Sequence, residues 1–115
     1  MKHLTINDVP LYVNPADADF VKRYADALEH AQKRIDNRDD NVRIDQKMLY
    51  ECETVYAFFD HTFGDGTAQK VFLGRHDMIE CIKALRMVVD EYEKAGEEYE
   101  KMIDSYAIRT TRAKR

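Results

Sequence analysis

What is scarce in this sequence already excludes several classes of protein. Tryptophan is absent, and the 115 residues include only two cysteines, two prolines and four glycines. Each cysteine, Cys52 and Cys81, falls inside a helical pattern, so we expect buried free thiols in a reducing compartment. No apolar run approaches the roughly 20 residues that span a bilayer. The first residues lack the apolar core and cleavage site of a signal peptide, and we therefore expect a cytoplasmic protein without a membrane partner.

A strong excess of basic charge is also missing. Acidic residues number 22 against 18 basic residues, which gives a net charge of −4. A protein that binds duplex DNA or RNA usually carries a basic patch or stripe, so we expect no nucleic-acid partner. At this length the chain is predicted to form one domain, residues 1–108, followed by a basic, disordered tail at 109–115.

The chain begins with a β-like segment. Leu4 and Ile6 alternate with polar residues, and Pro10 follows closely, so residues 1–13 are predicted to form a short hairpin with Pro10 near its turn. An isolated hairpin is marginal in water. We expect it to pack on the helices; the alternative is that its edge pairs with another chain.

Two helices of about 20 residues are predicted next. The first begins at Asn14, an N-cap residue, with Pro15 in the first helical position. It ends at a polar linker over residues 36–41, and the second helix covers residues 42–63. The predicted buried positions of the first helix are Val21, Tyr24, Leu28, Ala31 and Ile35. Those of the second are Ile44, Met48, Cys52, Val55, Phe59 and Phe63.

Residues 58–77 hold three of the four glycines and most of the phenylalanines. We predict an elbow between two helices, packed by aromatic rings and containing one short helical turn. Thr67 is expected to cap that turn and Gly74 to end it, while Asp77 caps the last helix with Glu80 completing a capping box. The residues assigned to this structural elbow are Phe59, Phe63, Gly64, Gly66, Phe72 and Gly74.

The last helix, of about 30 residues, carries apolar residues in a strict 4, 3 alternation. The positions are Met78, Ile82, Leu85, Val89, Tyr92, Gly96, Tyr99, Ile103 and Tyr106. Neighbours of about 20 residues cannot cover this whole seam. Either the first helix or the β segment covers its far end, or another protein chain does. The candidate partner-binding residues are Tyr92, Tyr99, Ile103 and Tyr106.

The predicted fold is therefore mainly α, with a short N-terminal β hairpin followed by an antiparallel three-helix arrangement that ends in a long C-terminal helix. No chemical motif accompanies it. The glycines of the elbow fit neither phosphate-loop pattern, and Thr62 and Gly64 stand where a calcium loop needs oxygen ligands. His61 and His76 lack zinc-site spacing, and Ser105 is the only serine. We predict no enzyme activity, no metal and no cofactor.

Residues 59–72 read Phe-Asp-His-Thr-Phe-Gly-Asp-Gly-Thr-Ala-Gln-Lys-Val-Phe. This segment resembles the aromatic-Asp-x-x-Phe-Gly-x-Gly-Thr-x-x-x-x-Phe segment of tail assembly chaperones from long-tailed phages and prophages of Gram-positive bacteria. The similar layout extends over about Leu4 to Tyr106, and the basic end has no counterpart. The resemblance implies a non-enzymatic protein of the bacterial host cytoplasm that binds the phage tape measure protein, assists assembly of the tail tube protein, and is absent from the mature virion.

Two other functions stay open at this point. The chain could be a helical adaptor, or a self-associating structural protein, of another kind. It could also be a small DNA-binding regulator that uses its basic C-terminus, although no helix-turn-helix pattern supports that function. The part of the heptad seam that its neighbours cannot cover favours a homo-oligomer, whether the protein is a tail assembly chaperone or a helical adaptor or structural protein.

Overall fold

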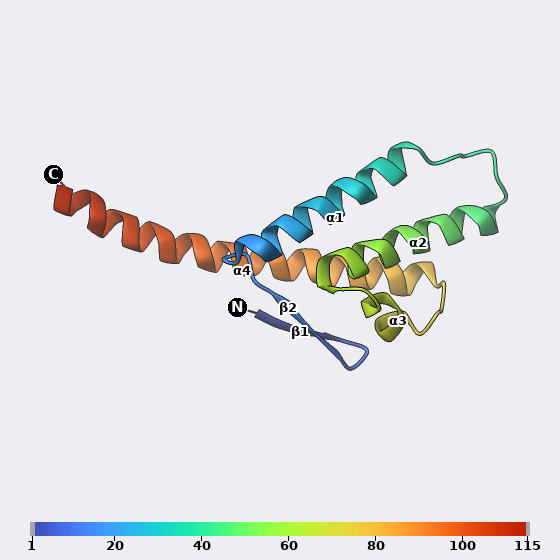
Figure 1. Cartoon of the computed structure of the whole chain (residues 1–115), viewed down its shortest axis with the longest axis horizontal. Coiled ribbons are helices and arrows are strands. Elements are labelled where there is room, and N and C mark those ends of the chain that lie inside the picture. Colours follow the sequence, from blue (N-terminus) through green and yellow to red (C-terminus); the bar gives the residue numbers. More distant parts are fainter. Residues whose placement is uncertain (1, 115) are drawn as a thin grey trace.

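The computed structural model describes the backbone of residues 2–114 and the side chains of residues 3–106. The elements in this range are β1 (Lys2–Ile6), β2 (Val9–Val13), α1 (Ala18–Asp36), α2 (Ile44–Phe63), α3 (Thr67–Phe72) and α4 (Met78–Lys114). The predicted class, mainly helical with an N-terminal antiparallel hairpin and a long last helix, is confirmed (Figure 1). α1 runs opposite to both α2 and α4, because the elbow carries the chain back before α4 begins.

The hairpin turns at Asn7 and Asp8, both of which have positive φ, two residues before Pro10. Pro10 lies within β2, opposite Thr5. Asn and Asp tolerate the left-handed backbone that a two-residue hairpin turn requires. One face of the hairpin joins the core through Ile6, Leu11 and Val13. The Asn7 side-chain amide also donates to the carbonyl of Val71 at 2.8 Å, so the hairpin packs on its own helices.

Helix α1 begins later than predicted. Its N-cap is Asp17, whose carboxylate accepts from the backbone N–H of Asp19 at 2.9 Å. Asn14 and Pro15 form a turn before the helix, in which the backbone N–H of Asp17 donates to the carbonyl of Asn14. The buried positions also differ from the predicted stripe. They are Phe20, Tyr24 and Ala27, whereas Leu28 and Ile35 are exposed.

Helix α2 is the centre of the fold, since it contacts α1, α3 and α4. Of the predicted stripe, Cys52, Val55 and Phe59 are buried. The full buried set of α2 is Cys52, Thr54, Val55, Phe58, Phe59 and Thr62. The predicted burial of its first two turns is wrong, because Ile44 and Met48 are exposed. The first two turns of α2 therefore contribute no residue to the buried core.

The elbow joins α2 to α4 and holds α3 as its one short helix. Gly64, Gly66 and Gly74 all have positive φ, a conformation that glycine adopts without steric cost. The caps differ from the prediction: Gly66 is the N-cap of α3, and Leu73, with a left-handed backbone, is its C-cap. Thr67 instead donates its hydroxyl to the carbonyl of Gly64 at 2.7 Å.

Helix α4 starts at Met78, as the Asp77 cap predicts. The Asp77 carboxylate accepts from the backbone N–H groups of Ile79 and Glu80. The second half of the predicted capping box is not formed, because Glu80 makes a two-pronged ion pair with Arg75. α4 continues without interruption through Gly96 to Lys114, so residues 109–114 of the predicted disordered tail have helical backbone. Its second half projects beyond the other elements (Figure 1). The whole molecule, with this projection, measures 64 Å along its longest axis.

Candidate functional site

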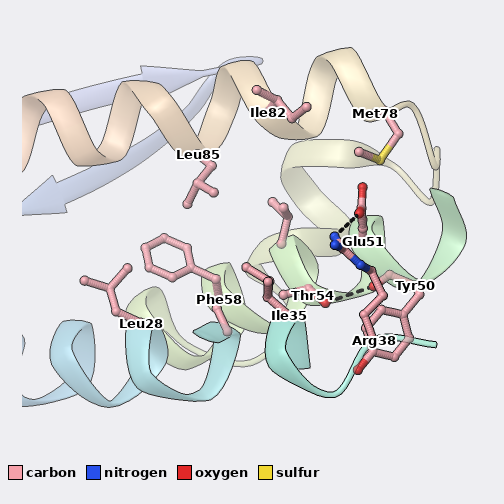
Figure 2. Close-up of a pocket in the computed structure, with 12 residues that line it drawn as sticks. Leu28, Ile35, Arg38, Tyr50, Glu51, Thr54, Phe58, Met78, Ile82 and Leu85 are labelled. Atoms are coloured by element: carbon pink, nitrogen blue, oxygen red, sulfur yellow. Dashed lines mark hydrogen bonds and ion pairs between the residues drawn. The ribbon is translucent and has the colours of Figure 1, made fainter. Parts of the chain in front are cut away.

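An apolar groove lies where α1 and α4 diverge, with α2 as its floor (Figure 2). α1 contributes Leu28, Ala31 and Ile35 to one wall, and α4 contributes Met78, Ile82 and Leu85 to the other. Each wall therefore spans eight residues of helix, or seven rises of 1.5 Å, which is about 10 Å. The floor is formed by Thr54, Val55 and Phe58. This wedge exists because no helix of the described chain fills the space between α1 and α4.

The groove is suited to apolar side chains. Eight of the twelve described residues that line it are aliphatic, phenylalanine or methionine, and its cavity measures about 220 Å³. Leu28, Ile35 and Ile82 are 40%, 46% and 54% exposed. Exposed aliphatic groups gathered on a concave surface mark a binding site more often than the same groups scattered singly.

The polar groups of the groove already have partners. The Thr54 hydroxyl donates to the Tyr50 carbonyl at 2.9 Å and accepts from Arg34 Nε at 2.7 Å. At the open end, Arg38 donates to the Glu51 carboxylate at 2.9 Å (Figure 2). A ligand would therefore meet few unsatisfied donors or acceptors, which favours an apolar ligand over a small polar substrate.

An aromatic stack joins α1 to α4 on the N-terminal side of Leu28. The rings of Tyr24 and Tyr92 stack with their centroids 4.0 Å apart, and Phe20 lies against both. Burial, followed by the nearby Tyr92 and Glu93, raises the pKa of Tyr24 to about 12, so its hydroxyl stays protonated at neutral pH. Tyr92, which the sequence predicts to face a partner, is half-buried, and its ring packs against α1 of its own chain.

Beyond the stack, α4 becomes an arm, which we define as residues 97–114. Its described large apolar side chains, those of Tyr99, Met102, Ile103 and Tyr106, are between 37% and 71% exposed. They occupy positions i, i+3, i+4 and i+7, which lie together on one face of a helix. Three of the four predicted partner-binding residues are thus exposed on one surface. Met102 belongs to the same surface but falls between the positions of the predicted heptad seam.

The arm is acidic around this apolar face. Residues 97–106 contain four carboxylates, Glu97, Glu98, Glu100 and Asp104, against one cation, Lys101. On a helix, Glu98 and Glu100 flank the face that carries Tyr99 and Ile103. The arm therefore offers an apolar strip with acidic edges.

The elbow is a packed structural unit. Phe72 lies between Tyr56 and Phe59, with ring centroids 5.0 and 5.2 Å away, and both phenylalanines are buried. Phe63 is only partly buried, at the edge of this cluster. The Asp60 carboxylate accepts from the backbone N–H of Ala68 at 2.8 Å and so holds the start of α3. His61 and His76 are both exposed, and the His76 ring stacks on Tyr56 with centroids 5.3 Å apart.

The cysteines pack on each other's helices as buried free thiols, as predicted. Burial raises the pKa of Cys52, and it raises the pKa of Cys81 to about 12. Both thiols are therefore protonated at neutral pH and poor nucleophiles. Among the residues with described side chains, no three His, Cys, Asp or Glu gather as metal ligands. No helix within residues 2–114 has both the length and the hydropathy to cross a membrane.

Sequence reasoning missed the groove. Leu28, Ile35 and Ile82 all fit the predicted apolar stripes, and each was assigned to the core. Helical periodicity does identify these residues as members of an apolar face. It carries no signal for the angle at which α1 leaves α4, and that angle decides whether the stripe is covered.

A protein-family model matches residues 7–115 of the chain, which is nearly its whole length. The chain belongs to DUF6673, a family of unknown function. Neither the curated proteins nor the solved structures include a match to this DUF6673 chain. The groove and the arm are therefore interpreted from their own chemistry.

Proposed function

We propose that this protein is a non-enzymatic chaperone that binds an amphipathic helical segment of a client protein in the groove between α1, α2 and α4. The observation that carries the proposal is an open groove with three exposed aliphatic residues on its walls and polar groups that already have partners. Helix-in-groove recognition uses this combination, with apolar anchors of the ligand spaced at i, i+3, i+4 and i+7.

The size of the groove agrees with a helical ligand. Walls of about 10 Å accommodate two turns of helix, which present three or four anchor residues. Burying each large apolar side chain contributes roughly 1.5–3 kcal/mol, against a cost of association of at least about 4 kcal/mol. A client segment of two turns would therefore bind weakly on its own. A client with several such segments would bind with a higher overall affinity through multivalency.

The resemblance of residues 59–72 to tail assembly chaperones supplies the client class. We propose the tape measure protein of a long-tailed phage or prophage, which is long and rich in helix, with the tail tube protein as a further partner. The chaperone would keep the tape measure protein soluble in the bacterial host cytoplasm while the tube assembles, and it would be absent from the mature virion.

The test is binding to overlapping fragments of the tape measure protein encoded in the same genome, measured by fluorescence anisotropy. The double substitution I35E/I82E places charge on both walls and should weaken binding at least tenfold. I79E is the matched control, since Ile79 is an exposed isoleucine of α4 outside the groove. Equal binding by the two variants would exclude the groove as the client site. A genome without a tape measure gene would exclude this client.

A further inference from the structure

We infer that the arm of one copy of this protein occupies the groove of a second copy. The strip of Tyr99, Met102, Ile103 and Tyr106 has the anchor spacing of a helix that lies in an apolar groove. The strip spans eight residues, and so do the groove walls Leu28–Ile35 and Met78–Leu85. The ligand that the groove requires is therefore present in the chain itself.

The occupant must come from another copy. α4 is one uninterrupted helix that forms a wall of the groove and then becomes the arm. Tyr99 lies 17 residues beyond Ile82, about 26 Å along the axis at 1.5 Å per residue. A helix that continues straight away from the groove cannot turn back into it, and Figure 1 shows the arm pointing away from α1 and α2.

Charge also favours this contact. The arm carries acidic residues on both flanks of its strip, Glu98 and Glu100. Arg86 is exposed one turn after Ile82, just past the α4 wall, whereas Arg38 at the open end of the groove is already paired with Glu51. The acidic arm would therefore meet the exposed Arg86 beside the α4 wall, and raised salt should weaken the association.

An arm–groove contact joins two different surfaces, so each copy has one of each. Such a contact forms a closed pair when two copies exchange arms, and otherwise a ring or an open chain. The client of the proposed function would compete with the arm for the same groove. The inference needs no client, and its test is carried out on this protein alone.

The test uses sedimentation velocity over a hundredfold concentration range around micromolar. Wild type should self-associate. The arm variant Y99E/I103E and the groove variant I35E/I82E should each be monomeric, because each lacks one of the two surfaces. An equimolar mixture of these variants should form a one-to-one heterodimer, since the mixture retains one intact arm and one intact groove. K101E, on the polar side of the arm, and I79E should associate like wild type.

Three results would overturn the inference. Wild type could stay monomeric throughout, the groove variant could associate like wild type, or the mixture could fail to form the heterodimer. The second result would point to arms that pair with each other, because the groove variant keeps an intact arm. All substituted residues are exposed, so circular dichroism should give the same helix content for every variant. If a double variant loses helix, the single variants I103E and I82E replace it in the same mixture.

Discussion

Removing the ring of Phe72 should strongly destabilise the fold. The side chain is 1% exposed, stacks on Tyr56 and meets the edge of Phe59. α3 is short and is held by Asp60 at its start, so we expect little collapse around the missing ring. Phe72→Ala should therefore lower the free energy of unfolding by about 3–5 kcal/mol. For a chain of this length that corresponds to a fall in Tm of roughly 12–20 °C.

Phe63→Ala is the internal comparison. The sequence predicts the same loss for both phenylalanines, but Phe63 is only partly buried, so its loss should be about half as large. Thermal and urea unfolding followed by circular dichroism measure both variants, and an unchanged urea m-value would show that the comparison is valid. If Phe72→Ala melts within about 3 °C of wild type, or if the two variants are equal, then the packing described for the elbow is wrong.

Three further changes test other parts of the structure. The Cys81 thiol, whose pKa is about 12 when folded, ionises near pH 8.5 when unfolded. Its contribution to stability is therefore complete below about pH 8.5 and is lost as pH rises toward 12, so urea unfolding at pH 8, 9 and 10 should show a steeper decline for wild type than for Cys81→Ala. Asp60→Ala removes the acceptor for the Ala68 N–H and should cost about 1–2 kcal/mol in urea unfolding, with a smaller loss for Asp60→Asn. EDTA, zinc, calcium and ATP should leave the melting curve unchanged, and a shift of several degrees with any of them would reveal a ligand that our prediction omits.

Features set by neighbouring residues could be predicted from the sequence. Glycines at positive φ mark the elbow, and Asp77 fixes the start of α4, because each depends on a few adjacent backbone groups. The start of α1 was harder to predict from the sequence. Asn14 and Asp17 are both good N-caps, and Pro15 suits a helix start as well as a turn. In the structure Asn14 begins the turn and Asp17 caps the helix. The preferences of the individual residues do not distinguish this arrangement from a helix that begins at Asn14.

Features set by distant residues could not be predicted. Whether Leu28 or Tyr92 is covered depends on where α1 crosses α4, and that crossing is fixed by Phe20 and Tyr24 against a ring about 70 residues later in the chain. Periodicity showed that the seam of α4 was too long for its neighbours. It did not show where coverage stops, and the boundary falls between Tyr92 and Tyr99.

Since one helix forms both the groove wall and the arm, it fixes the distance and the rotation between them. The distance and the angle from Ile82 to Ile103 are set by helical geometry alone, about 1.5 Å and 100° for each residue. Inserting a single residue between them would turn the strip by more than a quarter of a circle. Inserting seven would lengthen the spacing by about 10 Å and turn it by only about 20°. Evolution can therefore change the length of this segment readily only in steps that return the strip to the same side.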